Sequence, residues 1–272
     1  MILLKLLMLI AVPFLLRAAD GEPHHTTAFI SPPGTFESIA AYSFYKTDHF
    51  WNKNGRRLPS YNHFELSSAY LYSEYALNFC NSFTFNGRYD SIDETLNGHH
   101  QGFEEIEFGW KHLLLGDDKR AFTTQFLAII PGGKTKTSLR YGECGVQFNL
   151  LYSEIFSVFK KCGWCDFALG YRYYQHFPSD QIRASAAIGY DILPKGLIIL
   201  STQIEYGLYN GGRHHHISNI RLNPNYRLIS IQMEGVITPI QHFSAILGAF
   251  SHLWGRNVGV GGGIFGGVRF DY

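Results

Sequence analysis

The sequence of 272 residues predicts an all-β protein, an antiparallel transmembrane β-barrel of twelve strands with short periplasmic turns and longer outer loops. Three observations predict this fold. Apolar and polar residues alternate over most of the chain, the alternating segments are longer than ordinary globular strands, and the last residue is aromatic. Alternation of this kind is typical of strands with two different faces.

The composition agrees with this class. Hydrophobic residues make up 46% of the chain and charged residues only 17%, against about 25% charged residues in an average soluble domain. This excludes a disordered chain, and the net charge of +1 offers no basic surface for nucleic acid. A mean hydropathy close to zero argues against a helical membrane protein but is compatible with a barrel, whose strands alternate polar and apolar residues.

Residues 1–19 are predicted to be a secretory signal peptide. Lys5 supplies a positive start, an apolar run extends to Leu16, and two alanines follow near a cleavage point. The run is shorter than the ~20 apolar residues that a spanning helix needs, and an N-terminal anchor is the alternative. We therefore expect an exported protein, with 20–34 as a short N-terminal periplasmic segment and 35–272 as the barrel.

Period-two alternation begins shortly after Pro33. In the segment 102–115, for example, Ile106, Phe108 and Trp110 alternate with charged residues and glycine. Most of the alternating segments exceed the ~5–6 residues of a globular strand and match the ~9–11 of a tilted transmembrane strand. The predicted strands lie at approximately 35–45, 64–76, 82–93, 102–115, 121–131, 142–153, 165–177, 181–191, 197–209, 215–222, 227–237 and 263–272.

The connections predict the orientation of the barrel. With both termini in the periplasm, even-numbered connections face inward, and three of them are short turn sequences, at 116–119, 193–196 and 223–226. The long connections 46–63 and 238–262 both fall on the outer side, which is the asymmetry expected of such barrels. One even connection, 154–164, is longer than this rule expects.

Four cysteines remain in the exported chain, at positions 80, 144, 162 and 165. Cys162-Gly-Trp-Cys165 has the spacing of a thiol-redox pair or of half a zinc site, but no second pair of this spacing exists. In an oxidising compartment a disulfide is the expected state. Cys162 and Cys165 are therefore candidates for a local or intermolecular disulfide.

The C-terminal segment predicts how the barrel is assembled. Val268, Phe270 and Tyr272 share one face with Ile264, and the chain ends on Tyr272. This pattern resembles the assembly signal of bacterial outer-membrane barrels. The resemblance implies the barrel-assembly machinery and outer-membrane lipids as partners, and the cell outer membrane as the location.

The strand faces opposite the aromatic ones carry most of the charge. Ionisable groups at membrane depth are expensive unless they face water or a partner, so these residues are predicted to line the lumen. They would orient a polar solute or set ion selectivity, or alternatively fill the lumen with ion pairs of the barrel itself. The predicted lumen-lining residues are Glu105, Glu107, Lys111, Gln125, Gln147, Arg172, Arg183, Asp191, Gln203, Glu205, Glu234 and Arg269.

Short glycine-aromatic motifs, in order and spacing, resemble a family of outer-membrane transporters named after the meta-pathway of phenol degradation. They are Tyr42-Ser-Phe-Tyr45 with Asp48, Trp51 and Gly55, then Leu71-Tyr-Ser-Glu-Tyr75, Gly102-Phe-Glu-Glu-Ile-Glu-Phe-Gly-Trp-Lys111, Ile130-Pro-Gly-Gly133, Leu169-Gly-Tyr-Arg172, and Pro178-Ser-Asp-Gln-Ile-Arg183 with Gly189. The resemblance runs from about residue 35 to the C-terminus and implies a barrel that transports solutes. The chain departs from the family at Ala76, where a glycine is usual, and at Glu104-Glu105, where Gly-Asp is usual.

Two other site types have weaker support. His214, His215 and His216 with His99 and His100 supply imidazoles, but no carboxylate or cysteine completes a metal site. His216-Ile-Ser-Asn219 resembles the His-x-Ser-Asn core of outer-membrane phospholipases. However, Ile220 replaces the expected glycine, and no Asn lies about a dozen residues beyond Ser218. We therefore predict no metal, no cofactor and no catalytic residues.

Together these features predict a non-enzymatic pore or channel for uptake or efflux of small molecules across the outer membrane. The alternative is a structural or surface-interaction barrel with an occluded lumen, in which the cysteines link chains. An outer-membrane lipid hydrolase is the remote alternative. The identity of the solute and the oligomeric state are left open by the sequence.

Overall fold

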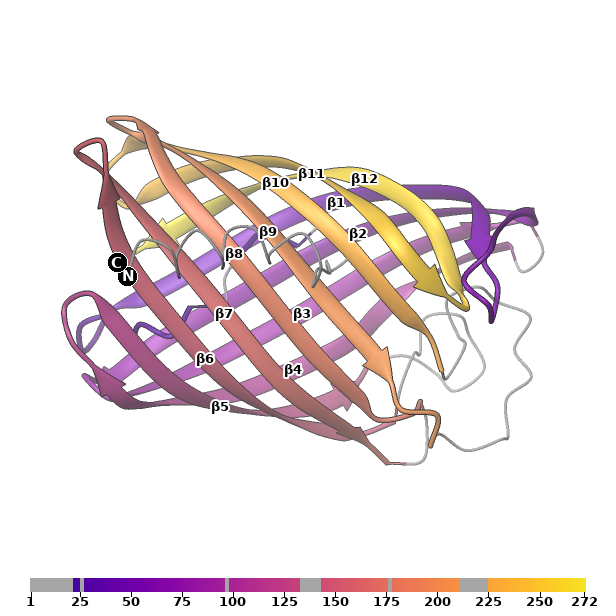
Figure 1. The fold of residues 1–272 in the computed structure, drawn as a ribbon, viewed down its shortest axis with the longest axis horizontal. Coiled ribbons are helices and arrows are strands. Elements are labelled where there is room, and N and C mark those ends of the chain that lie inside the picture. Colours follow the sequence, from indigo (N-terminus) through magenta and orange to yellow (C-terminus); the bar gives the residue numbers. More distant parts are fainter. Residues whose placement is uncertain (1–21, 25–26, 96–97, 133–142, 176–177, 211–224) are drawn as a thin grey trace.

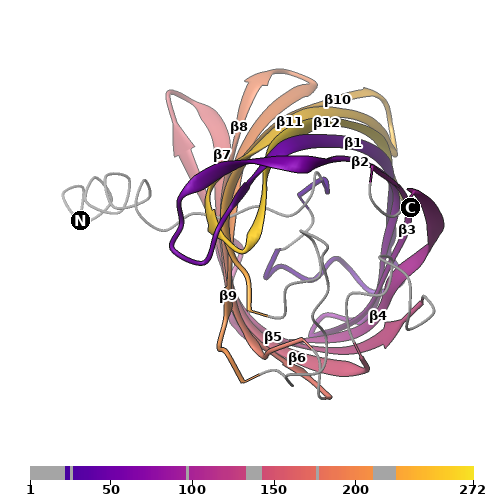
Figure 2. The same cartoon turned by 90° about the vertical axis from the view of Figure 1, so that its right-hand side faces the viewer.

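The computed structural model describes residues 22–24, 27–95, 98–132, 143–175, 178–210 and 225–272. They form a closed barrel of twelve antiparallel strands (Figures 1 and 2), as the alternation predicted. No helix in these residues is long and apolar enough to cross a membrane. The strands are β1 (Phe36–Trp51), β2 (Arg57–Asn78), β3 (Asn81–Glu94), β4 (Gly98–Gly116), β5 (Arg120–Pro131), β6 (Gly145–Val158), β7 (Lys161–Tyr174), β8 (Gln181–Leu193), β9 (Gly196–Gly207), β10 (Arg227–Ile240), β11 (Phe243–Arg256) and β12 (Val258–Asp271).

Each strand pairs with its neighbours in sequence, and the barrel closes between β1 and β12. At the seam Ala40 lies opposite Val268, and Phe44 lies opposite Ile264. Closure leaves no sheet edge, so every strand bonds its backbone groups to another strand. This is what a wall immersed in hydrocarbon requires, because lipid cannot satisfy a free backbone N–H or C=O group.

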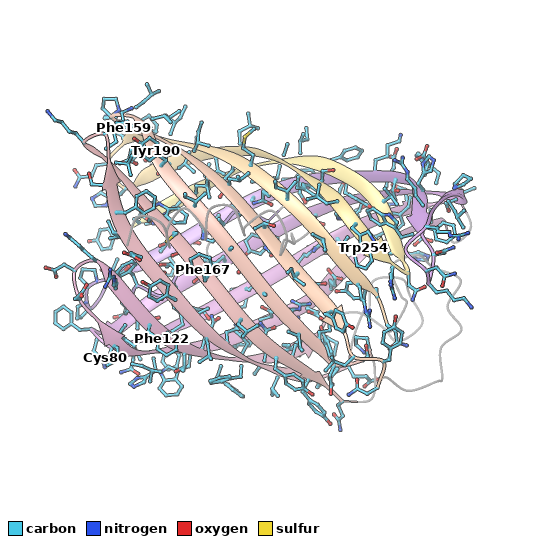
Figure 3. All side chains as sticks on the ribbon, in the orientation of Figure 1. Cys80, Phe122, Phe159, Phe167, Tyr190 and Trp254 are labelled. Carbon is cyan, nitrogen blue, oxygen red and sulfur yellow. The ribbon has the colours of Figure 1, made fainter. Side chains whose placement is uncertain are left out.

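The outer surface of the wall is apolar and aromatic. On β4, Phe108 and Trp110 are exposed, while Gly109 and Lys111, which alternate with them, are buried. Figure 3 shows the same arrangement around the barrel, with Phe167 of β7 standing on the outside. Successive side chains of a strand point to opposite faces, so the alternation read from the sequence becomes an apolar outside and a polar inside.

The two ends of the barrel differ in their connections. The start of β1 and the end of the chain lie at the same rim, where Phe36 and Tyr272 exchange backbone hydrogen bonds of 2.8 Å. The connections at this rim contain only two or three residues, whereas those at the opposite rim include the long segments 132–144 and 208–226. The short connections are 79–80, 117–119, 159–160, 194–195 and 241–242. The predicted asymmetry of turns and loops is confirmed, and the rim with the short turns is called the periplasmic rim below, because short turns face the periplasm in outer-membrane barrels.

Two predicted outer loops are wrong. The segment 238–262 contains strand β11, and most of 46–63 belongs to β1 and β2. Strand β11 was not predicted because its outward Leu247 and its inward Ile246 and Phe250 are all apolar, which weakens the alternation of polar and apolar residues. The predicted strand 215–222 lies outside the described residues, and Asn225 and Tyr226 precede β10 at the outer rim instead of forming an inner turn.

The connection 154–164, which looked too long for a periplasmic turn, is a tight hairpin. Strands β6 and β7 extend to either side of Phe159 and Lys160, whose φ angles are 50° and 62°. Two successive residues with positive φ are typical of the two-residue turn that matches strand twist. The exception to the short-turn rule therefore disappears.

The predicted local disulfide between Cys162 and Cys165 is also wrong. Both residues lie on β7, and both are thiols in this structure. Residues three apart on a strand are separated by about 10 Å and point to opposite faces, whereas a disulfide needs Cα atoms within about 7 Å. The sequence spacing could not reveal this, because the same spacing on a turn or helix would bring the sulfurs together.

The N-terminal segment differs from its expected place in the periplasm. Its described residues, 22–24 and 27–34, lie inside the ring of strands (Figure 2). The Ala28 amide donates to the Ser153 hydroxyl of β6 at 2.7 Å, and the Thr123 hydroxyl of β5 donates to the Ala28 carbonyl. Ala28 is fully buried. The inward hydroxyls of the wall thus satisfy the backbone of this segment.

An apolar cluster fills the inside of the barrel at the closing seam. It comprises Ile39, Tyr45, Phe64, Leu66, Tyr70, Tyr72, Ile92, Ile246, Phe250 and Phe265. Glycines make room for these rings. A Cβ atom at Gly248 would overlap the Phe265 ring and lie 2.8 Å from the Met233 carbonyl oxygen, whereas Gly235 on the adjacent strand has open space beside it.

We predict that Gly248→Ala destabilises the barrel by about 1–3 kcal/mol, since overpacking forces rings and backbone to move. The matched variant Gly235→Ala should leave stability nearly unchanged. Urea unfolding in detergent micelles, followed by tryptophan fluorescence, measures both. Equal midpoints for the two variants would contradict the close packing of Phe265 against β11.

Candidate channel lumen

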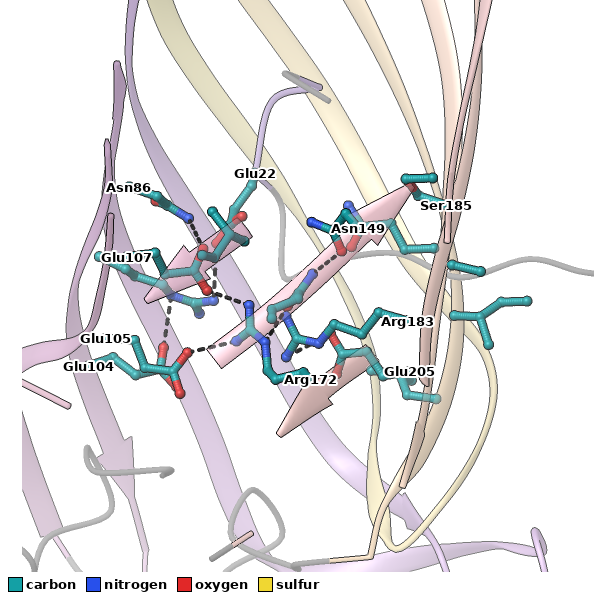
Figure 4. A pocket seen from close by; sticks show the side chains of 18 of the residues that line it. Glu22, Asn86, Glu104, Glu105, Glu107, Asn149, Arg172, Arg183, Ser185 and Glu205 are labelled. Atoms are coloured by element: carbon teal, nitrogen blue, oxygen red, sulfur yellow. Dashed lines mark hydrogen bonds and ion pairs between the residues drawn. The ribbon is translucent and has the colours of Figure 1, made fainter. Parts of the chain in front are cut away.

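A cavity of about 270 Å³ lies inside the barrel, between the wall and the N-terminal segment (Figure 4). Its lining combines apolar side chains such as Tyr45, Phe64 and Leu66 with many charged ones. The charged residues lining it are Glu22, Arg88, Glu104, Glu105, Glu107, Lys111, Arg172, Arg183 and Glu205. The cavity lining is therefore mixed, with apolar and charged side chains together.

Nine of the twelve residues predicted to line the lumen line this cavity: Glu105, Glu107, Lys111, Gln125, Gln147, Arg172, Arg183, Gln203 and Glu205. The other three lie elsewhere. Glu234 is buried and accepts the backbone N–H of His24 at 3.0 Å. Arg269 forms ion pairs near the periplasmic rim with Glu37 and Asp271, and Asp191 lies half-buried near the short β8–β9 turn.

Arg172 on β7 joins the largest group of polar side chains in the cavity. Its guanidinium Nη1 lies 3.0 Å from Glu105 Oε2, and Nη2 forms an ion pair with Glu107. Its Nε donates to Gln147, and Nη1 also donates to the Tyr174 hydroxyl oxygen at 3.2 Å. Only 2% of the side chain is exposed. The guanidinium thus links β7 to β4 across the interior.

Arg88 on β3 organises a second group. Its Nε lies 2.8 Å from Asp90 Oδ1 and 3.2 Å from Glu104 Oε2, and Nη2 donates to the Ser68 hydroxyl at 3.0 Å. Nη1 lies 3.6 Å from Glu22 of the N-terminal segment. One cation therefore ties three strands to the segment inside the barrel.

A β-bulge brings two adjacent glutamates into the lumen. Gly87 pairs with Ile106 and Tyr89 with Phe103, so Arg88 lies opposite both Glu104 and Glu105. A bulge places two residues against one and changes which side chains face inward. Both carboxylates consequently line the cavity, at the position where the sequence departs from the Gly-Asp of the family that it resembles.

Arg183 and Lys111 each form one further ion pair in the cavity lining. Arg183 Nη2 lies 3.5 Å from Glu205 Oε1, and Glu205 also accepts the Tyr226 hydroxyl. Lys111 Nζ lies 3.0 Å from Glu74 and is 2% exposed. A buried charge is tolerated when it is paired and hydrogen-bonded, and these contacts satisfy that condition.

The N-terminal segment takes part in the same polar interior. His24 Nε2 lies 2.9 Å from Asp166 Oδ2, and its ring stacks on Trp164 at a centroid distance of 5.2 Å. The Glu22 carbonyl accepts a hydrogen bond of 2.7 Å from Gln232 on β10. Contacts on β3, β7 and β10 thus hold the segment across the lumen.

Acidic groups outnumber basic ones in the described lining. Five carboxylates face four cations in the cavity, although the whole chain carries a net charge of +1. Glu74 and Asp90, buried beside Lys111 and Arg88, add to the excess. The described lining therefore carries a small excess of negative charge.

Some of these residues were missed from the sequence. Arg88 and Asn86 follow the alternation of the predicted strand 82–93 and could have been found from it. Glu104 could not, because a bulge breaks the alternation that would identify its face. Glu22 and His24 lie before the first strand, where no periodic signal exists.

The weaker site types receive no support. The described residues contain no group of three or more histidine, cysteine, aspartate or glutamate side chains that could hold a metal. His99 lies 2.8 Å from Asp93 instead. His214–His216 and the phospholipase-like segment 216–219 lie outside the described residues.

We predict that Arg172→Met costs about 3–5 kcal/mol of stability, since removing one partner leaves Glu105 and Glu107 buried without their cation. Urea unfolding in micelles measures the loss. Arg269→Gln, at a more exposed pair, should cost less than about 1 kcal/mol. Adding Glu105→Gln and Glu107→Gln to Arg172→Met should restore much of the loss, and a failure to do so would contradict the network.

Comparisons with known proteins identify the architecture. No family model and no curated protein matches the sequence. An outer-membrane channel from Pseudomonas putida F1 has a TM-score of 0.73 at 11% identity, covering 92% of this chain and all of that chain. The NanC porin has a TM-score of 0.51 at 7% identity, covering 86% of this chain and 98% of the porin. The chain therefore has the fold of an outer-membrane β-barrel of the channel and porin type.

Proposed function

We propose that this protein is an outer-membrane channel for passive passage of small molecules, a member of the transporter family that its glycine-aromatic motifs resemble. The observation that carries the proposal is a charged cavity enclosed by a closed wall with an apolar outside. Charged side chains at membrane depth need water or a partner. A lumen lined in this way provides a polar path through hydrocarbon.

The lining supports a preference for cationic solutes. Its acidic excess attracts positive charge, and lining residues such as Tyr45, Phe64 and Leu66 offer contact to a hydrocarbon or aromatic group. Rings of carboxylates are the usual device of cation-selective pores. Small cations and cationic or neutral amphipathic molecules fit this combination better than anions.

A structural barrel with an occluded lumen is the second candidate. The N-terminal segment favours it, because Ala28 and His24 occupy the interior and bond to the wall. We propose that the segment narrows the path without closing it, since the cavity beside it persists. A small conductance is then expected, well below that of a wide porin.

Export, location and assembly belong to the same proposal. The signal peptide would direct the chain to the periplasm, and the outer-membrane lipids would surround the aromatic surface. Val268 and Phe270 of β12 and the following Tyr272 are exposed, where the barrel-assembly machinery could bind them. Transport rather than catalysis is the proposed activity.

Single-channel recording of the refolded mature chain, residues 20 to 272, in a planar bilayer tests the proposal. Under a KCl gradient we expect a steady, small open level and a reversal potential of the sign set by K⁺. Glu105→Gln should reduce this cation preference and Arg183→Gln should increase it, because each changes the charge of the cavity. Lys119→Gln, on an exposed periplasmic turn, is the matched control and should have no effect.

The two candidates give opposite outcomes. A sample that is folded by heat-modifiable migration but silent in the bilayer supports the occluded barrel. Anion-selective current that Glu105→Gln and Arg183→Gln leave unchanged would contradict the proposed lining.

A further inference from the structure

Two arginines lie side by side on the outer surface of the barrel, near the outer rim. Arg227 is the first residue of β10 and Arg256 the last of β11, and they are directly opposed cross-strand partners. Arg227 also lies opposite Tyr206 on β9. Trp254, two residues before Arg256, marks this end of the wall in Figure 3.

The register places these side chains on the lipid-facing surface. Leu228 and Glu205, the residues next to Arg227 and Tyr206, line the internal cavity. Because successive side chains point to opposite faces, Arg227 and Tyr206 point outward. The exposed fractions of Tyr206 and Trp254, 40% and 37%, agree with this assignment.

Aromatic rings hold both guanidinium groups. The Arg227 Cζ lies 3.8 Å from the centroid of the Tyr206 ring and 4.8 Å from that of Tyr209. The Arg256 Cζ lies 5.5 Å from the Trp254 ring. These are cation–π distances, so the rings fix the guanidinium groups without neutralising their charge.

Neither arginine has an anionic partner in the described part of the chain. The Nε–H groups of Arg227 and Arg256 are buried and donate no hydrogen bond to a described residue. By contrast Arg120, an exposed arginine at the periplasmic rim, pairs with Glu154 at 3.1 Å. Like charges directly opposite each other on neighbouring strands are destabilising. An anion bound between the two guanidinium groups would therefore offset their mutual repulsion.

We propose that Arg227 and Arg256 bind the phosphate group of a phosphorylated glycolipid in the outer leaflet. Guanidinium groups match phosphate through paired, charge-assisted hydrogen bonds, and both still have donors available. Tyr206, Tyr209 and Trp254 supply the aromatic girdle that sits where acyl chains meet headgroups. The ligand is a lipid because the site lies on the outside of the wall and not in the lumen.

The inference rests on the outer-membrane placement proposed above but not on conduction. Its test uses the full mature chain in detergent micelles, with bisphosphorylated lipid A as the probe and native mass spectrometry as the readout. The double variant Arg227→Gln/Arg256→Gln should bind this probe about tenfold or more weakly. The control Arg120→Gln should bind like the parent chain, and lipid A without phosphates should bind weakly to all three.

Other outcomes would overturn the proposal. Equal binding of the phosphorylated and phosphate-free lipids by the parent chain excludes phosphate recognition, even if the double variant fails to fold. Displacement of the lipid by millimolar inorganic phosphate would assign the site to free anions instead. By contrast, a double variant that loses lipid binding but keeps its single-channel conductance would support the proposal and show that this site is separate from the channel.

Discussion

The rest of this structure depends on one constraint, that a backbone crossing hydrocarbon must bond all its N–H and C=O groups within the protein. Antiparallel pairing of twelve strands meets it only when β1 joins β12, and pairs such as Ala40 with Val268 complete the circle. A closed wall has an inside and an outside, so the period of two in each strand separates apolar residues from charged ones. The polar interior follows from closure, and the possible functions follow from the polar interior.

Charges inside such a wall are retained only with partners. Arg172 bonds to Glu105 and Glu107, and Arg88 to Asp90 and Glu104. The same contacts that make these charges tolerable also fix them around a cavity, where we propose that their acidic excess acts on a passing solute. The N-terminal segment uses the leftover hydrogen-bonding capacity of this interior, through His24 on Asp166 and Ala28 on Ser153. Stability and the proposed selectivity therefore depend on the same side chains.

Alternation made the barrel and most of the lining predictable from sequence, because the position of a residue along a strand determines whether its side chain points into the lumen or outward. Glu107 and Arg172 were found this way and lie together in the cavity. The failures have local causes. Glu104 was missed at a bulge, β11 was missed because apolar residues occupy both its faces, and the Cys162–Cys165 disulfide failed because an extended strand separates residues three apart. The location of Glu22 and His24 inside the barrel depends on tertiary contacts alone, so no pattern in the sequence predicts it.

The central claim is that the N-terminal segment and the wall form one polar network inside a closed barrel, and cross-linking tests it most directly. The Thr27 and Ser153 hydroxyl oxygens lie 3.2 Å apart, close enough for a disulfide between two introduced thiols. In a chain with its four native cysteines replaced by serine, oxidation of the folded Thr27→Cys/Ser153→Cys protein should form this bond nearly completely, whereas Thr27→Cys/Ser244→Cys should not. If the first pair stays reduced while both thiols react with a bulky water-soluble reagent, the segment lies outside the barrel and the account is contradicted.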